Sequence, residues 1–442
     1  MAHVAEQKDR DLYLGLYERF DRSDAAGPAW LRSIRRRAIA RFGDLGFPTT
    51  RQEEWRFTSV APIAAQAFQP GAGVTLNPAD IAPATFAADG LCQLVCVDGR
   101  YQAALSTVGP LPAGVRVASL GALLGADPGL VEPHLTRLAT IEDEPFTALN
   151  TALFEDGAVV IVPAGVVVEA PLHLLFVAAG APAPTMAAPR VLIVAHENSQ
   201  VRVVESYAGT GAGVTFTNAV TEVVVGPNAV VDHYKVQRER EEAFHVGRMH
   251  VHMGRGANFS SHSIALGGAL ARNDVVAVLD GEGGECTLNG LYVADGRRLV
   301  DNHTTIDHAK PHCDSHEVYK GILAGQAHGV FNGKILVRPD AQKTNAKQTN
   351  RALLLSDTAQ VNTKPQLEIF ADDVKCTHGA AVGQLDEDAI FYLRSRGLDL
   401  DQARAMLIRA FAGDILGRIR VKPLRDRLEA EMVRLLPGDA AA

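Results

Sequence analysis

The chain has 442 residues, of which 47% are hydrophobic and 21% are charged, as in ordinary soluble globular proteins. It carries 43 Lys and Arg against 51 Asp and Glu, a net charge of −8. Nucleic-acid binding requires a basic surface that neutralises phosphates, so a general role on nucleic acid is excluded. The length predicts two or three domains.

Cysteine usage indicates a reducing compartment. The count is odd, and only two of the five cysteines are close in sequence, so a disulfide framework is not expected. The first residues lack the apolar stretch of a signal peptide, and no run approaches 18 apolar residues. We therefore expect a cytoplasmic protein without a membrane partner.

Residues 9–43 predict helices. Leu12, Leu16 and Phe20 recur on one side of the first helix, and a Gly-bounded stretch follows. The one basic cluster, residues 32–41, alternates arginines with apolar residues at helical spacing, which favours a solvated helix face over a nucleic-acid patch.

The next part of the chain is irregular. Residues 61–90 are rich in Ala, Pro and Gly and predict a loop. Asp98-Gly99 lies between two apolar runs, which is typical of a β-hairpin.

Residues 150–380 predict β-structure throughout. Short polar or Gly-containing turns recur, and each precedes a β-like run. Alternation is clear where Met249, Val251 and Met253 face one way and the residues between them face the other. The run is long for a sandwich, so a solenoid of stacked coils is the better interpretation.

After residue 383 the pattern becomes helical. Asp386 is a predicted N-cap, and Asp399 with Gln402 has capping-box spacing. Ala403, Met406, Leu407 and Ala410 form one stripe, which could pack on its own domain or on a partner. The predicted division is 1–145, N-terminal helical or mixed; 146–382, solenoid; and 383–442, C-terminal helical.

The stretch "DDVKCTHGAAVGQLDE" contains a candidate ligand pair. Residues two apart in a strand point to the same side, so Cys376 and His378 could present a thiol and an imidazole together. Both groups suit zinc, copper or iron, but two ligands do not complete a tetrahedral site. Further ligands would have to come from elsewhere in the fold or from another chain. The alternative is a buried Cys beside a hydrogen-bonded His.

The richest histidine stretch contains His303, His308, His312 and His316. Pro311 argues against a helix that would bring the last three together. These histidines could bind a metal, or they could be ordinary side chains that are exposed or hydrogen-bonded in the core. No P-loop, no G-x-S-x-G motif, no Rossmann fingerprint and no C-x-x-C pair is present.

Several motifs together resemble a known family. They are "RQEEWRFTSV", "DNHTTIDHAKPHCDSHEVYKGIL", the long block from "FNGKILVRPD" through "VKCTHGA" to "FYLRSRGL", and the helical tail. The chain resembles the SufB/SufD family, scaffold subunits of the SUF iron–sulfur cluster assembly system. "VKCTHGA" followed by "GQLDE" looks like the SufD branch. The resemblance implies a right-handed parallel β-helix between helical regions.

The resemblance also implies partners and roles for a non-enzymatic scaffold. It implies pairing with SufB through the β-helix, with a homodimer possible for the chain alone, and docking of the ATPase SufC on the C-terminal helices. His378, with Cys376 beside it, would hold a nascent cluster or iron at the SufB interface. SufC docking would involve Met406, Leu407, Ala410 and Phe411. A flavin is associated with the family's complex, and no site for it is assigned here.

Two alternatives belong to other classes. A carbohydrate-active β-helix enzyme would use clustered carboxylates and basic groups, for which Asp301, Asp307, Asp314 and Arg272 are the candidates. An inert solenoid adaptor would have no metal role, and replacement of His378 would leave it fully functional.

Overall fold

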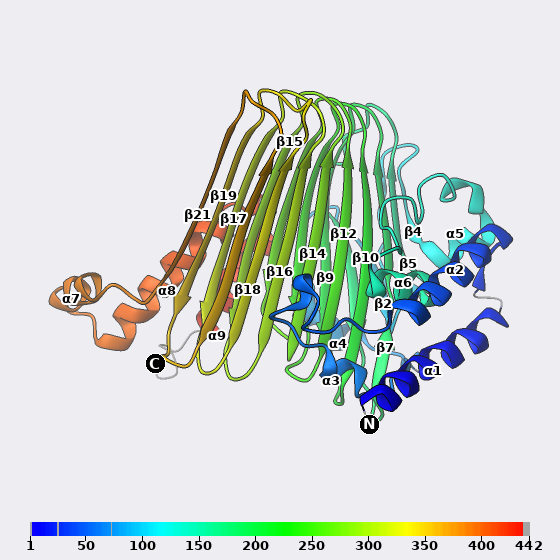
Figure 1. Ribbon diagram of the computed structural model, residues 1–442, viewed down its shortest axis with the longest axis horizontal. Helices are drawn as coiled ribbons and strands as arrows, with labels where there is room; N and C mark the ends of the chain where they lie inside the picture. Colours follow the sequence, from blue (N-terminus) through cyan, green and yellow to red (C-terminus); the bar gives the residue numbers. More distant parts are fainter. Residues whose placement is uncertain (1, 24–25, 72, 436–442) are drawn as a thin grey trace.

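Two long β-sheets form the body of the molecule, as the computed structural model shows for residues 2–23, 26–71 and 73–435 (Figure 1). One sheet has 11 strands, with β7 beside β10 and β1 beside β7. Its other strands follow the order β20 (Gln360–Ile369), β18 (His328–Val337), β16 (Leu299–His308), β14 (Leu270–Leu279), β12 (Phe244–Met253), β10 (Thr215–Val225), β8 (Arg190–Ala195), β5 (Gly157–Val162) and β4 (Arg116–Ser119); β7 is Thr185–Ala187 and β1 is Gln69–Pro70.

The second sheet has ten strands. They follow the order β21 (Lys375–Gly383), β19 (Asn345–Leu354), β17 (Asp314–Leu323), β15 (Glu285–Ala294), β13 (Asn258–Ala265), β11 (Val230–Arg238), β9 (Gln200–Gly209), β6 (Leu172–Ala178), β2 (Cys92–Val97) and β3 (Arg100–Tyr101). From β8 to β21, consecutive strands alternate between the two sheets and pair in parallel with the strands of neighbouring coils. The predicted parallel β-helix is therefore confirmed.

Inward-pointing side chains of both sheets fill the solenoid. Met249, Val251 and Met253 are buried together, as their alternation predicts. In-register stacking puts Val251 between Val223 and Ala277 of the adjacent coils. Each coil thus buries its inner row against the coils before and after it, which is how a solenoid builds its core.

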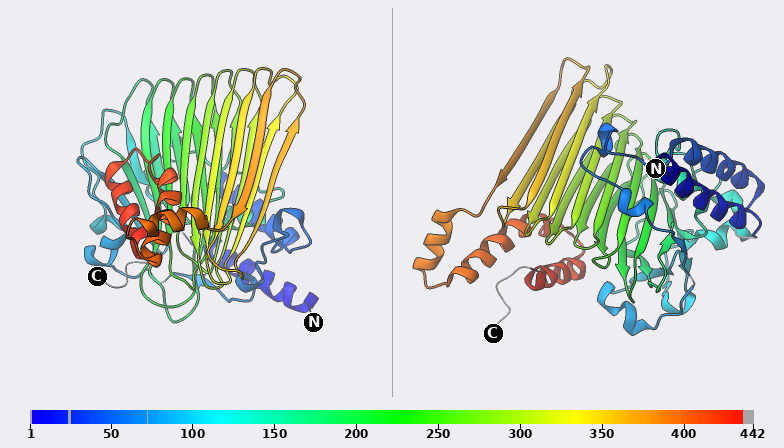
Figure 2. Two further views of the ribbon diagram at one scale, coloured as in Figure 1. Left: turned by 90° about the vertical axis from the view of Figure 1, so that its left-hand side faces the viewer. Right: turned by 60° about the horizontal axis from the view of Figure 1, so that its bottom comes forward.

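Helices cover the outer faces of both sheets (Figure 2). The first helices pack with Phe216 and Phe244 on the 11-stranded sheet, and the C-terminal helices pack with Tyr234 and Ile264 on the ten-stranded sheet. The helices are α1 (Ala2–Asp21), α2 (Ala29–Leu45), α3 (Ala61–Ala64), α4 (Pro78–Ile81), α5 (Leu120–Ala126), α6 (Pro145–Leu153), α7 (Glu387–Ser395), α8 (Leu400–Leu416) and α9 (Lys422–Leu435). Short 3-10 helices are η2 (Glu53–Trp55), η3 (Ala82–Ala84), η4 (Ala103–Leu105) and η5 (Pro128–Leu130).

The local predictions are confirmed at several points. Asp98 and Gly99 both have positive φ and join antiparallel strands β2 and β3 as a hairpin. Asp386 caps α7, and Asp399 with Gln402 forms the capping box of α8. Residues 61–90, expected to be a loop, contain short helices as well. The division at residues 146 and 383 stays a prediction.

The interpretation of residues 32–41 as a solvated face is wrong for Arg35. This side chain is fully buried and donates hydrogen bonds to the carbonyls of Ala26, Thr151 and Ala152. Burial lowers the pKa of Arg35 to about 9. The helix pattern placed Arg35 correctly on α2, but only the contact of α2 with α6 explains its burial.

Candidate ligand site at the open end of the solenoid

The last coil is formed by β20 and β21, and no further strand of the described residues stacks on it. Each of its strands pairs within its sheet with the preceding strand only, and none of the residues in β20 or β21 is fully buried. The strands at the other positions of the stack have buried inner rows. The interior of the β-helix therefore reaches the surface at this end, seen at the left of Figure 1.

Cys376 and His378 both belong to the inner row of β21. In register, Cys376 lies beside Ala346 and His378 lies beside Gln348, and these two residues of β19 are buried. Cys376 is half-buried and His378 is exposed. The register thus puts Cys376 and His378 on the same side of β21, as their spacing predicts. His378 is exposed, unlike a buried core histidine.

The Cys376 thiol is not activated by its own surroundings. Burial raises the pKa of Cys376, and a backbone hydrogen bond from Ala346 only partly opposes this shift. Because metals and sulfur chemistry require the thiolate, a bound metal or a cation from outside this site would have to favour its deprotonation.

The ligand set on this chain is incomplete. In the parts of the chain that the structure describes, no group of three or more His, Cys, Asp or Glu side chains is arranged to hold a metal ion. Two side chains leave a tetrahedral centre half-filled. A metal bound by Cys376 and His378 would need ligands from a second molecule.

The histidines of residues 303–316 do not converge on one site. His303 lies on the outer face near Glu54 and Asp301, whereas His308 is buried and hydrogen-bonded to the Ser315 hydroxyl at 2.9 Å. The other two, His312 in a turn and His316 on the outer face of β17, are exposed. This dispersion leaves them without a shared metal site among the described residues.

The "RQEEWRFTSV" segment clamps the N-terminal region onto the 11-stranded sheet. Trp55 covers the Arg272 guanidinium, whose carbon lies 3.6 Å from the ring centroid, and Thr58 donates a 2.6 Å hydrogen bond to Asp301. Arg272 also pairs with Asp301 and Asp274. This clamp was not foreseen from the sequence, because its partners lie more than 200 residues away.

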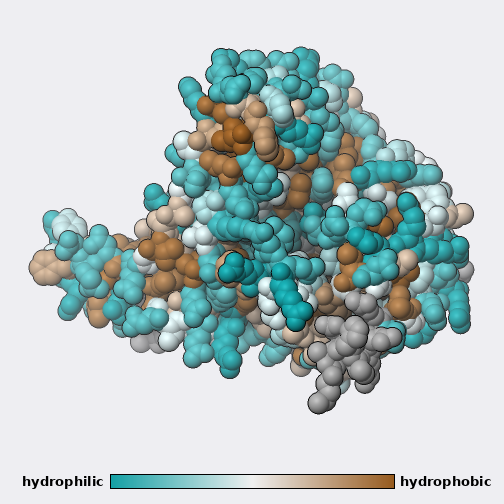
Figure 3. All heavy atoms as spheres, in the orientation of Figure 1, coloured by the Kyte–Doolittle hydropathy of each residue, from teal (hydrophilic) through white to brown (hydrophobic). Residues whose placement is uncertain are grey.

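The outward side of α7 and α8 carries exposed hydrophobic side chains (Figure 3). Met406 is 44% exposed and Phe391 is 75% exposed, beside Tyr392. The buried face of α8 is a different set, formed by Ala403, Ala405, Ile408, Ala412, Ile415 and Leu416. The predicted stripe therefore combined two faces.

The other residues of the predicted docking surface are less exposed or smaller. Ala410 is exposed, and Leu407 and Phe411 are half-buried. The Lys320 ammonium lies 4.6 Å from the centre of the Phe411 ring and donates to the Phe411 carbonyl. The exposed aromatic pair on α7, Phe391 and Tyr392, was missed by sequence reasoning, although "IFYLRSR" shows two adjacent aromatics in a short helix.

Family models match most of the chain. The core domain of SufBD proteins of SUF system FeS cluster assembly matches residues 176–411, and the SufBD N-terminal region matches residues 7–174. The chain belongs to the SufBD family.

Relatives of this SufBD protein agree with that assignment. An iron–sulfur cluster assembly SufBD family protein of Synechocystis is 36% identical, covering 87% of both chains. The iron–sulfur cluster assembly protein SufD of Escherichia coli is 32% identical, covering 89% of this chain and 90% of the relative, and SufD of Bacillus subtilis is 26% identical, covering 92% and 94%. Iron–sulfur cluster assembly in the SUF system is thus the role of this chain.

The carbohydrate-enzyme alternative is not favoured in this family or by the geometry. Asp301 is bound to Arg272 and Thr58, and the remaining carboxylates are paired elsewhere. Asp307 pairs with Arg338, and Asp314 accepts from Asn345. These candidate groups stabilise the coils of this SufBD protein and do not form a shared cleft of carboxylates.

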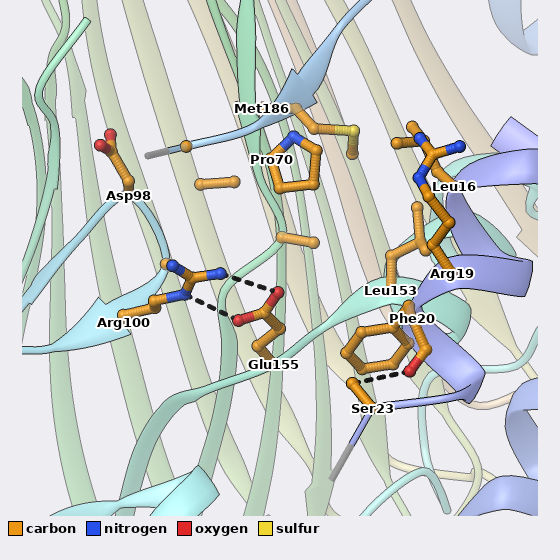
Figure 4. A pocket seen from close by; sticks show the side chains of 14 residues that line it. Leu16, Arg19, Phe20, Ser23, Pro70, Asp98, Arg100, Leu153, Glu155 and Met186 are labelled. Atoms are coloured by element: carbon orange, nitrogen blue, oxygen red, sulfur yellow. Dashed lines mark hydrogen bonds and ion pairs between the residues drawn. The ribbon is translucent and has the colours of Figure 1, made fainter. Parts of the chain in front are cut away.

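A separate hollow of about 260 Å³ lies near the first coils (Figure 4). Phe20, Pro70 and Met186 line it, and Arg100 and Glu155 pair at its edge at 2.8 Å. None of the predicted ligand or docking residues lines this hollow. No helix in residues 2–23, 26–71 or 73–435 has the length and apolar character needed to cross a membrane.

Proposed function

We propose that this SufBD protein is a non-enzymatic scaffold that presents His378 and Cys376 as half of a ligand set for iron or a nascent cluster. The observation that supports this most directly is their position in the inner row of the last coil, on which no further described strand stacks. The cluster or iron is the cargo of the assembly reaction. The scaffold supplies placement, and ATP hydrolysis belongs to SufC.

The two ligands suit a transient site. A neutral imidazole binds iron and releases it more readily than a thiolate does, so His378 can assist iron entry without retaining the metal. Cys376 keeps its proton until a metal is present, because burial raises the pKa of its thiol. Loading would therefore begin at His378 and recruit Cys376 as metal arrives.

SufB is the proposed partner at the open end. The outer edges of β20 and β21 offer unpaired backbone groups, and Ile369, Phe370 and Val382 expose apolar surface there. A second solenoid that continues both sheets would satisfy these edges and bring its own ligands to His378. For the chain alone, a second copy could cover the same end as a homodimer.

SufC is the proposed partner of the C-terminal helices. Phe391, Tyr392 and Met406 provide an apolar surface with aromatic anchors of the kind that dominate protein interfaces. Lys320 of β17 contacts Phe411 and pairs with Asp414 at 2.8 Å, so α8 is tied directly to the solenoid. We propose that ATP-driven movement of SufC reaches the SufB interface by this route.

The proposed location is a reducing cytoplasm. All five cysteines are free thiols, which fits such a compartment. The flavin associated with this kind of complex is proposed only for the whole assembly, and no flavin site is assigned on this chain.

The ligand role is tested by His378→Ala in the complex co-expressed with SufB and SufC. We expect at least a tenfold loss of iron and sulfide bound per complex, because a metal ligand is removed. His316→Ala is the matched control, since His316 is also exposed but lies on the outer face of β17. Unchanged iron and sulfide in an intact His378→Ala complex would make the chain an inert adaptor.

A further inference from the structure

Inward-pointing residues stack on one another from strand to strand, and the stack that ends at His378 becomes polar two coils before the open end. Register stacks Leu288, Glu317, Gln348 and His378 on consecutive strands of the ten-stranded sheet. Leu288, Glu317 and Gln348 are at most 1% exposed. Neighbouring strands lie about 4.8 Å apart, so Gln348 is directly behind His378.

The Gln348 amide is held by Glu317 on one side only. Its Nε2 donates a 2.7 Å hydrogen bond to Oε2 of Glu317, one strand further into the stack. Its Oε1 is buried and has no hydrogen-bond partner among the described residues. A buried carbonyl oxygen that accepts no hydrogen bond is costly, and this one lies one strand from an imidazole.

The opposite sheet leaves room for this amide. Gly333 of β18 faces it across the interior, and a Cβ at this position would lie 2.2 Å from Nε2 of Gln348. Any larger residue at position 333 would displace the amide. The Gln348 amide therefore occupies space that Gly333 leaves open by having no side chain.

We propose that Gln348 is a positioning residue whose Oε1 accepts a hydrogen bond from the ring N–H of His378, fixing one imidazole tautomer and leaving the other ring nitrogen free to bind iron. Glu317 holds the amide in the required orientation. The inference rests on the proposed ligand role of His378.

The chemistry favours an amide at this place. A neutral imidazole has one N–H and one lone pair, so an acceptor behind the ring determines which nitrogen faces the metal. Gln348 does this without adding a charge beside the cargo. Burial raises the pKa of Glu317 to about 7, and the N–H of Gln348 opposes that shift by stabilising the carboxylate.

The test measures the tautomer of His378 by ¹⁵N NMR in the full chain with labelled histidine, with the His378 signals assigned by their loss in His378→Ala. We expect one fixed tautomer in the natural chain. Gln348→Met, of similar size but without an acceptor, is expected to show tautomer averaging. In the complex with SufB and SufC, Gln348→Met should lower bound iron and sulfide about tenfold.

Asn350→Leu is the matched control. Asn350 is also buried with a free Oδ1, but its row ends at Ala380, so its loss should leave the His378 tautomer unchanged. Tautomer averaging in the natural chain, or a fixed tautomer in folded Gln348→Met, would overturn the inference. If Gln348→Met does not fold, Gln348→Leu, which also lacks an acceptor, decides the question by the same measurement.

The two proposals fail in different ways. Unchanged iron and sulfide with His378→Ala would remove the ligand role and the basis of the inference with it. Loss of iron and sulfide with His378→Ala, together with full assembly in Gln348→Met, would remove only the positioning role.

Discussion

Inward-pointing cysteines lie at both ends of the solenoid, but they are buried at one end and partly exposed at the other. Near the first coils, Cys92 and Cys96 occupy the inner row of β2, are 1% and 0% exposed, and belong to one core cluster with Val115 and Val117. At the last coil, Cys376 occupies an equivalent row and is half-buried. An inner-row residue is core where another layer covers it and a potential ligand where none does.

The reactivity of the cysteine thiols should show the largest difference between the two ends of the solenoid. We expect a maleimide to modify Cys376 first in the native chain, because Cys92, Cys96, Cys286 and Cys313 are buried. Mass spectrometry after a short reaction should find one labelled site, and all five after unfolding. Cys376→Ser is the control, and rapid native labelling of any other cysteine would contradict the described burial.

Replacing one glycine in the covered interior and one in the last coil should change the free energy of unfolding by different amounts. Gly333→Ala should destabilise the chain by about 1–3 kcal/mol, because the added Cβ would collide with the Gln348 amide. Gly379→Ala in the last coil should change the free energy of unfolding by less than about 0.5 kcal/mol, since nothing lies within 4 Å of its Cβ position. Urea unfolding of both variants measures the difference, and equal effects would argue against a covered interior at Gly333.

The N-terminal clamp should give the smallest effect, one that depends on pH. Burial alone would lower the pKa of His303, but the charge of Asp301 and the hydrogen bonds that the ring donates to Asp301 and Glu54 raise it to about 9. A raised histidine pKa adds stability that is complete below the unfolded pKa of about 6.5 and is lost as pH rises through 9.

The variant His303→Gln isolates this contribution. Thermal unfolding between pH 6 and 10 should show a decline in the natural chain that is weaker in His303→Gln. Parallel pH profiles for the two chains would show that the ion pairs of His303 with Asp301 and Glu54 do not contribute in solution.

Much of the fold and part of the site could be predicted from local sequence patterns. Alternation at Met249 and Val251 predicts the inner rows, and residue types at Asp386 and Asp399 predict helix starts, because these features depend on near neighbours. Parity alone put Cys376 and His378 on one side of a strand. The proposed partners and the role came from the family resemblance.

Other features depend on contacts between distant residues. The strand formed by residues 375–383 resembles the strands before it in sequence, so its exposure follows only from the absence of a further coil. The contact between Gln348 and Gly333 crosses from one sheet to the other, and the Trp55–Arg272 clamp joins residues far apart in the chain. Helical spacing also merged the exposed Met406 with the buried Ala403.

Iron K-edge X-ray absorption of the complex with SufB and SufC, trapped while carrying iron, tests the central claim most directly. With the natural chain, we expect a histidine-nitrogen contribution to the iron environment that disappears in His378→Ala and persists in His316→Ala. An iron environment that is the same in all three complexes would contradict a ligand set shared at the open end.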